Sequence, residues 1–260
     1  MTAQKLLEHV QIFPTGAALM EAAATAITAA SAAAMRGSQR FVVALSGGAT
    51  PRDLYARLAR PPYAGQLEWR HVHVCWGDER CVAPDDPASN YRMAREALLD
   101  QVPIPALNVH RIRGEDDPVS AAAAYEHELR AMFATPEGAP RSTPGARFDL
   151  VLLGMGNDGH TASLFPATTA IRETGPQARW VRAQHVESVS SWRITLTPAL
   201  LNAAAEVLFL VSGAEKAPAL RAVLTGPYQP EKLPAQIIAP QAGRLRWFVD
   251  AAAAVNLPQS

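Results

Sequence analysis

Short apolar runs recur along the chain, separated by longer segments that mix small, apolar and polar residues. Runs of about four to eight mostly aliphatic residues, bounded by glycine, proline or charged residues, are typical of buried strands in a parallel sheet. On this pattern we predict strands at residues 40–45, 71–76, 107–112, 148–153, 207–211 and 244–249, with short extended segments at 180–184 and 193–196.

The segments between these runs predict helices. Residues 15–35 are rich in alanine and contain no proline, so helix propensity favours one long helix, which Gly37 ends. Thr50 is expected to cap the next helix, at residues 52–60, with Pro51 at its first position and Asp53 completing a capping-box-like pair. Further helices are predicted at residues 89–100, at 118–133, after Thr197-Pro198, and from 212 to about 224.

Strands and helices thus alternate, which predicts an α/β fold, a mostly parallel open sheet with helices on both faces. Three prolines, at positions 136, 140 and 144, predict a surface loop over residues 135–145 rather than a domain linker. A chain of 260 residues with 48% hydrophobic content can bury a sizeable core, and we expect a single domain over residues 1–260.

Charge and targeting signals argue against several classes of protein. The formal net charge is zero and no block of Lys or Arg occurs, so we expect no nucleic-acid partner. The first residues lack a basic region followed by an apolar signal core, and no run of about 18 apolar residues is present, so we expect a soluble, cytoplasmic protein with no membrane partner. The two cysteines, Cys75 and Cys81, are expected to be reduced.

One glycine-rich stretch is the best candidate for chemistry, Gly154-Met155-Gly156-Asn157-Asp158-Gly159-His160-Thr161. It follows the strand predicted at residues 148–153, and ligands of open α/β sheets bind at the carboxyl ends of strands. Glycines let the backbone approach a ligand closely, while Asp158 and His160 add a carboxylate and an imidazole.

The same stretch formally matches the Gly-x-Gly-x-x-Gly fingerprint of dinucleotide-binding proteins. Three features oppose that interpretation. Asp158 would bring a negative charge to a pyrophosphate, Pro166 limits any following helix, and no strand ending in an acid comes about 20 residues later.

A second glycine turn, Ser46-Gly47-Gly48, precedes a predicted helix and would direct free N–H groups and a helix dipole at a bound phosphate. A plain strand-to-helix turn explains these glycines equally well. The Gly-Lys-Ser/Thr ending of a nucleotide-binding P-loop is missing. Arg193 and Lys216 also lie at element boundaries, where each is either a surface charge or a contact for an anion.

Two further kinds of site are weaker alternatives. His71, His73 and Cys75 alternate along one strand and share a face, which is also the pattern of residues lining a core or an interface, so we expect no metal. No Gly-x-Ser-x-Gly turn is present to carry a nucleophilic serine.

Several motifs, in their order and spacing over about residues 40 to 220, resemble the 6-phosphogluconolactonase family. They are Ser46-Gly47-Gly48-Ala49-Thr50-Pro51, Trp76-Gly77-Asp78-Glu79-Arg80, Ser89-Asn90-Tyr91, the stretch from Gly154 to Pro166, Arg193-Ile194-Thr195-Leu196-Thr197, and Ser212-Gly213-x-x-Lys216. The resemblance implies a Rossmann-like fold similar to those of glucosamine-6-phosphate isomerases and ribose-5-phosphate isomerases.

It also implies a carboxylic ester hydrolase that opens 6-phospho-D-glucono-1,5-lactone to 6-phosphogluconate, the second step of the oxidative pentose phosphate pathway. The family's mechanism would make His160 the general base, since an imidazole ordinarily titrates near pH 6.5, at about the pH where it works. Asp158 would support it, by contacting either His160 or the sugar hydroxyls. We expect a monomer with no cofactor and the sugar-phosphate lactone as its small-molecule partner.

Carried over residue by residue, the phosphate would bind Ser46 and the backbone of Gly47 and Gly48, with Arg193 and Lys216 as charged clamps. Asp78 could bind hydroxyls and Arg80 would line the pocket, whereas Glu79 would simply pair with Arg80. The segment 187–192 departs from the family's usual proline-rich, lysine-bearing one, so the rigidity of that loop is not implied.

Two other functions remain to be separated from lactone hydrolysis. The related glucosamine-6-phosphate isomerases/deaminases share the Asp-Gly-His core but end it in Asn-Glu-Pro, where this chain has Leu164-Phe165-Pro166. Phe165 would remove a carboxylate used in their proton transfer. A non-catalytic sugar-phosphate sensor would keep the pocket without the activity.

Overall fold

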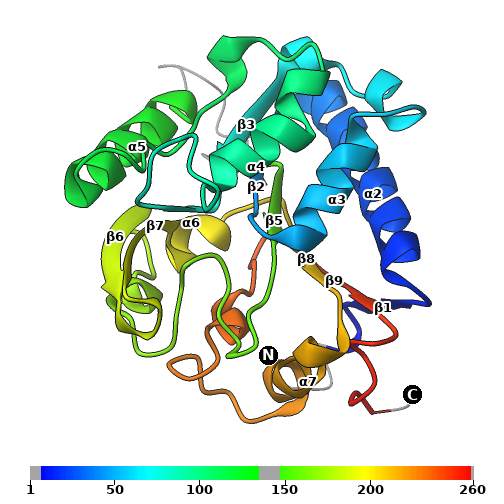
Figure 1. The fold of residues 1–260 in the computed structure, drawn as a ribbon, viewed down its shortest axis with the longest axis vertical. Helices are drawn as coiled ribbons and strands as arrows, with labels where there is room; N and C mark the ends of the chain where they lie inside the picture. The colour runs from blue at the N-terminus through cyan, green and yellow to red at the C-terminus, as the bar shows by residue number, and fades with distance from the viewer. Residues whose placement is uncertain (1–6, 135–146, 259–260) are drawn as a thin grey trace.

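The computed structural model of the protein describes residues 7–134 and 147–258. A six-stranded sheet forms its centre (Figure 1), with the strand order β1-β9-β8-β5-β2-β3 and every neighbouring pair parallel. The strands are β1 (Val10–Phe13), β2 (Phe41–Leu45), β3 (Val72–Trp76), β5 (Leu150–Leu153), β8 (Glu206–Val211) and β9 (Arg244–Asp250). All residues of the central strands β2 and β5 are buried, as expected of strands covered on both faces.

Helices cover both faces of this sheet. The α-helices are α2 (Gly16–Gly37), α3 (Ala49–Leu58), α4 (Asn90–Ala97), α5 (Pro118–Met132), α6 (Pro198–Leu201) and α7 (Ala217–Thr225). Because crossover connections between parallel strands are almost always right-handed, the strand order places α2 and α3 on one face and α5 and α7 on the other, the arrangement in Figure 1. The predicted fold class is therefore confirmed.

The long helix α2 begins as the sequence predicts. The Thr15 hydroxyl accepts a hydrogen bond of 3.1 Å from the Ala18 N–H group, which caps the helix, and its buried stripe packs toward the sheet. By length and composition α2 is apolar enough to cross a membrane. Its packing against β9, β2 and α3 is that of a core helix in an α/β protein.

A second, three-stranded antiparallel sheet, in the order β4-β7-β6, was not predicted. It comprises β4 (Asp78–Arg80), β6 (Val181–Val186) and β7 (Ser191–Leu196). The extended segments at 180–184 and 193–196 are its hairpin, whereas β4 has three charged residues and no hydrophobic pattern. Only Gly77 separates β3 from β4, so the small sheet adjoins the central sheet at the carboxyl ends of its strands.

Most predicted elements are confirmed, but one predicted strand of the sheet is wrong and one strand was missed. The strand predicted at residues 107–112 is a 3-10 turn over Ala106–Asn108 followed by a single parallel bridge from Val109 to Val74. Strand β1 was missed because its four residues lie at the sheet edge and none of them is buried. The loop predicted at residues 135–145 lies outside the described residues.

Candidate active site

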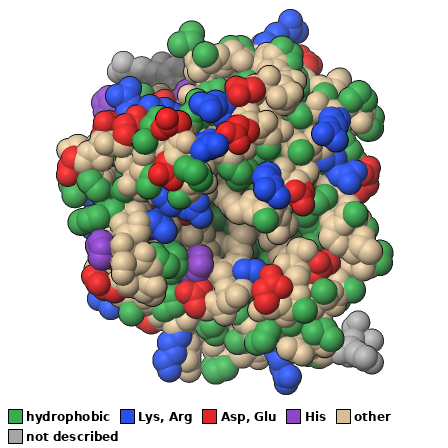
Figure 2. Space-filling model, viewed as in Figure 1, with side chains coloured by type: hydrophobic (Ala, Val, Ile, Leu, Met, Phe, Trp, Pro, Cys, Tyr) green, Lys and Arg blue, Asp and Glu red, His purple; other side chains and the backbone are tan. Residues whose placement is uncertain are grey.

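The carboxyl ends of β2, β3, β5 and β8 surround a cavity of about 360 Å³. Figure 2 shows a hollow near the middle of this face, bordered by Lys, Arg and His side chains. The cavity is lined by residues 46–51, Asp78, Arg80, Asn90, residues 154–156, His160, Ala162, residues 210–212, Glu215 and Lys216. Segments far apart in the sequence thus converge where open α/β sheets bind ligands.

His160 and Asp158 contact each other directly in the glycine-rich loop after β5. The Nδ1 atom of His160 lies 2.5 Å from Oδ1 of Asp158, and the same oxygen accepts a hydrogen bond of 3.1 Å from the His160 N–H group. Because Nδ1 donates to the carboxylate, Nε2 is left with its lone pair. His160 lines the cavity and Asp158 does not, so the carboxylate is linked to the cavity through its contact with the imidazole.

The charge of Asp158 is set by this contact. Partial burial raises the pKa of the carboxyl group, but the hydrogen bond and the charge of His160 oppose this, and the net pKa lies below its ordinary value. Asp158 is therefore ionised at neutral pH and can stabilise a positive charge on the imidazole.

Glycines make the tight loop possible. A side chain at position 156 would place its Cβ atom 2.1 Å from Nδ1 of His160 and 2.6 Å from Oδ1 of Asp158. Gly159 has a φ of 77°, in the left-handed region that favours glycine. The Gly156 N–H group donates to the His160 carbonyl over 2.8 Å and closes the turn. The loop thus requires glycine at 156 so that the Asp158–His160 pair can form.

Phe165 lies against the other side of the imidazole. The two ring centroids are 4.0 Å apart with planes inclined by 22°, a stacked arrangement. Phe165 is buried, so the stack restricts rotation of the His160 ring. The carboxylate expected of an isomerase is absent at this position, and an apolar face replaces it.

The Ser46-Gly47-Gly48 turn follows β2, lies beside the glycine-rich loop and lines the same cavity. The cap predicted for its helix is wrong. Helix α3 begins at Ala49 with Gly48 as its N-cap, because Gly48 adopts a φ of 105° that turns the chain into the helix earlier than Thr50 would. Thr50 and Pro51 therefore lie inside the first turn and Asp53 caps nothing. Among the described residues, the N–H groups of Gly47 and Gly48 have no hydrogen-bond partner, and they remain free for an anion.

Two arginines face each other beside the cavity. Arg80 on β4 and Arg193 on β7 are directly opposite in the antiparallel register, and such pairs project to the same side of a sheet. Burial and the charge of Arg80 lower the pKa of Arg193. Arg80 lines the cavity, while Arg193 donates to Ser191 Oγ over 2.5 Å and is not part of the lining. Two like charges held this close form a favourable place for an anion.

Lys216 lies across the cavity from the arginines. It ends the 3-10 turn Ala214–Lys216 and occupies the N-cap position of α7 without a side-chain capping hydrogen bond, a position where a cation opposes the helix dipole. Lys216 and Glu215 both line the cavity, so the ammonium group is available to a ligand there.

The neighbouring carboxylates of Glu79 and Asp78 contact different parts of the structure. The Glu79 side chain is buried and accepts hydrogen bonds from the N–H groups of Asn90 and Tyr91, which start α4, so the predicted pairing with the Arg80 guanidinium is wrong. Burial raises the pKa of Glu79. Asp78 lines the cavity, where Ser163 Oγ donates to its Oδ2 over 2.5 Å.

Three further residues contribute to this site and were not among the site residues predicted from the sequence. Asn90 lines the cavity and donates to the Asp78 carbonyl over 3.0 Å, Ser163 holds the Asp78 carboxylate, and the Tyr55 hydroxyl contacts the backbone of Ser46. Asn90 and Ser163 were noticed only as parts of motifs. Tyr55 carries no local signal, because its partner lies on another element.

No group of three or more His, Cys, Asp or Glu side chains within residues 7–134 and 147–258 is arranged to hold a metal ion. The three residues considered as ligands do not form a set. Cys75 is fully buried, and Nδ1 of His73 lies 3.1 Å from Nε2 of His110.

The fold and cavity define an α/β protein in which an acid–imidazole pair and a glycine turn with free N–H groups lie at the carboxyl ends of two neighbouring parallel strands. The family model described as glucosamine-6-phosphate isomerases/6-phosphogluconolactonase matches residues 14–247. A 6-phosphogluconolactonase of Nostoc sp. is 42% identical over 249 residues, covering 95% of this chain and 98% of the relative. A 6-phosphogluconolactonase of Haemophilus influenzae is 41% identical, covering 81% of this chain and 85% of that protein.

A solved structure agrees with these matches. The 6-phosphogluconolactonase from Trypanosoma cruzi superposes with a TM-score of 0.82 at 30% identity, covering 96% of this chain and 97% of that one. The chain belongs to the glucosamine-6-phosphate isomerase/6-phosphogluconolactonase family.

Proposed function

We propose that this protein hydrolyses 6-phospho-D-glucono-1,5-lactone to 6-phospho-D-gluconate, the second step of the oxidative pentose phosphate pathway. Relatives named 6-phosphogluconolactonase, at about 40% identity over most of the chain, support this activity. The observation that carries the proposal is the hydrogen-bonded Asp158–His160 pair, whose imidazole lines the same cavity as the 46–48 turn.

In this mechanism His160 is the general base. Its Nε2 takes a proton from a water molecule as the water oxygen attacks the lactone carbonyl, and the Asp158 carboxylate stabilises the imidazolium that forms. The tetrahedral intermediate then collapses, the bond from the carbonyl carbon to the ring oxygen breaks, and His160 returns the proton to that oxygen. No covalent enzyme intermediate is needed.

The rest of the cavity would hold the substrate by its charge and hydroxyl groups. The free N–H groups of Gly47 and Gly48, the Ser46 hydroxyl and Lys216 would bind the phosphate. Arg193 would contribute charge from beside the cavity. Asp78, fixed by Ser163, would accept hydrogen bonds from sugar hydroxyls, and Arg80 would line the pocket between them.

Phe165 favours lactone hydrolysis over sugar-phosphate isomerisation. Isomerisation with ring opening needs additional proton transfers, and Phe165 presents an aromatic face to His160 at the position where the isomerases carry a carboxylate. A sensor would have no use for an ionised carboxylate that fixes the imidazole tautomer.

One comparison of activities separates the three functions. A lactonase accelerates decay of the lactone above its spontaneous rate and releases no ammonia from glucosamine-6-phosphate. A deaminase releases ammonia, whereas a sensor binds 6-phosphogluconate without turnover. Ammonia release, or lactone decay at the spontaneous rate, would reject our proposal.

The organisation of the protein is proposed on the same basis. We expect a single-domain monomer in the cytoplasm, acting without a cofactor. The packing of α2 against the sheet and α3 supports its role as a core helix rather than a membrane anchor.

A further inference from the structure

Two buried tyrosines contact the backbone at the carboxyl ends of β2 and β3, next to the cavity. The hydroxyl of Tyr55, on α3, accepts a hydrogen bond of 2.9 Å from the Ser46 N–H group and donates one of 2.8 Å to the Ser46 carbonyl. The hydroxyl of Tyr125, on α5, does the same at Trp76, with 2.9 Å and 3.1 Å. Each hydroxyl therefore satisfies both backbone groups of one residue.

These contacts replace missing strand pairing. The register of β2 with β3 ends at Leu45 opposite Trp76, and its register with β5 ends one residue earlier, at Ala44. Ser46 therefore lies just beyond the paired region, while Trp76 ends a strand at the sheet edge. A buried N–H or carbonyl group left without a partner is costly, so the tyrosines stabilise backbone groups that no neighbouring strand pairs.

Each of the two residues held by a tyrosine, Ser46 and Trp76, precedes a segment that lines the cavity. Ser46 is followed by Gly47 and Gly48, whose N–H groups are free, and Trp76 is followed by Gly77 and β4 with Asp78 and Arg80. The side chains of both tyrosines are buried, and burial raises the pKa of each hydroxyl, so both stay protonated and keep donating.

We propose that Tyr55 and Tyr125 are positioning residues, whose hydroxyls fix the backbone of the 46–48 turn and of β4 at the places where β2 and β3 separate. Tyr55 holds the free N–H groups of the turn toward the phosphate, and Tyr125 fixes the segment that carries Asp78 and Arg80. The role of Tyr55 rests on the proposed binding of phosphate at this turn.

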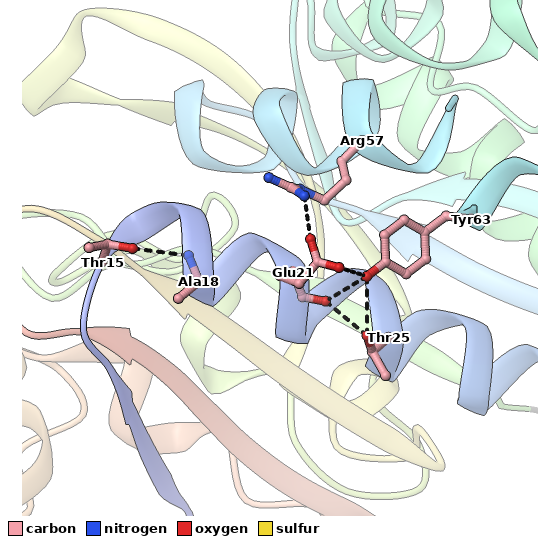
Figure 3. Close-up of polar contacts among 6 residues, drawn as sticks. All are labelled: Thr15, Ala18, Glu21, Thr25, Arg57 and Tyr63. Carbon is pink, nitrogen blue, oxygen red and sulfur yellow. Dashed lines mark hydrogen bonds and ion pairs between the residues drawn. The ribbon is translucent and has the colours of Figure 1, made fainter. Parts of the chain in front are cut away.

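Tyr63 supplies a matched control. Its hydroxyl is also hydrogen-bonded, to Glu21 and, over 3.3 Å, to Thr25, but these residues join α2 to the segment after α3 and none lines the cavity (Figure 3). Removing this hydroxyl tests the general cost of a lost tyrosine contact without disturbing a site loop.

The test compares Tyr55→Phe, Tyr125→Phe and Tyr63→Phe by lactone kinetics and by calorimetric titration with inorganic phosphate. For Tyr55→Phe we expect about a tenfold rise in KM and about a tenfold weaker phosphate affinity, with kcat within about threefold. For Tyr125→Phe we expect a phosphate affinity within about twofold of wild type and a kcat/KM about tenfold lower. Tyr63→Phe is expected to change melting temperature alone.

Amide hydrogen exchange of the wild-type protein tests the contact between the Tyr55 hydroxyl and the Ser46 backbone without any substitution. We expect a protected Ser46 amide, and Gly47 and Gly48 amides that exchange fast and become protected when inorganic phosphate is added. If Tyr55→Phe and Tyr125→Phe match Tyr63→Phe in kinetics and phosphate affinity, or if the Ser46 amide exchanges freely, the positioning role is overturned. A wild type that neither binds phosphate nor hydrolyses the lactone would instead refute the proposed function, and this role with it.

Discussion

The Nδ1 atom of His160 lies 2.5 Å from Oδ1 of Asp158, and this contact decides which imidazole nitrogen is left for chemistry. With Nδ1 engaged, Nε2 is the atom that can accept a proton beside the cavity. Replacing Asp158 by Asn keeps the shape but removes the charge, and allows the amide to donate to Nδ1 and so favour the wrong tautomer. We expect kcat to fall by at least about tenfold with a smaller change in KM. Asp100→Asn, at an exposed site, serves as the control; equal kcat values in the two variants would contradict this role.

Gly156 is required by the same pair. In Gly156→Ala the added Cβ atom would meet His160 Nδ1 at 2.1 Å, so the ring must move away from Asp158. We expect kcat to drop at least about tenfold because the imidazole is displaced, and the melting temperature to fall as well because Gly156 is buried. Gly65→Ala, where nothing lies within 4 Å of the new atom, should leave both quantities unchanged. Full activity of Gly156→Ala would show that the pair tolerates displacement.

Lys216 is expected to contribute to binding more than to the chemical step. It lines the cavity at the N-terminus of α7, and loss of one charge-assisted hydrogen bond to phosphate should raise KM about tenfold. Steady-state kinetics of Lys216→Met, with the exposed Lys232→Met for comparison, measure this effect. If Lys216→Met has the KM of wild type, the phosphate does not contact this ammonium group.

Stability at acidic pH should depend on His73. Burial lowers the pKa of His73, and the charges of His110, Arg40 and His71 lower it further. In the unfolded chain His73 has the ordinary imidazole pKa of about 6.5. The contribution of its neutral form to the free energy of unfolding is therefore complete above that pH, and it is lost as pH falls toward the lower pKa of the folded state. When pH is lowered from about 7.5 to about 5.5, the melting temperature of His73→Gln should therefore fall less than that of the wild type. His127→Gln, at an exposed position on α5, should behave like wild type; if His73→Gln does too, this account of His73 is wrong.

The sequence predicts the strands of the central sheet well because buried strands carry continuous apolar runs, as at residues 148–153. It fails where pairing rather than pattern decides the structure. Strand β4 is three charged residues that become a strand only by pairing with β7, and residues 107–112 look like a strand but form one bridge to Val74. Tertiary context overrides local propensity at both places.

In the candidate site too, features marked by a local sequence pattern could be predicted, whereas those fixed by tertiary contacts could not. His160, Lys216 and the 46–48 turn were singled out from the sequence, because glycines and charges at strand ends indicate a ligand site, and all of them line the cavity. The Asp158–His160 contact could not be predicted, since residues two apart in a loop need not touch. Glu79 was expected to pair with its neighbour Arg80, but it accepts hydrogen bonds from the start of α4, ten and more residues later. Tyr55 and Tyr125 act through hydroxyls that reach across from other elements, and no spacing in the sequence indicates such contacts.

The central claim is that His160 acts as the general base in lactone hydrolysis. It is tested most directly by the decay of 6-phospho-D-glucono-1,5-lactone without protein, with the wild type and with His160→Ala. We predict that the wild type far exceeds the spontaneous rate and that His160→Ala lowers turnover by at least about a hundredfold, the usual contribution of a general base. Turnover by His160→Ala close to that of the wild type would contradict the mechanism.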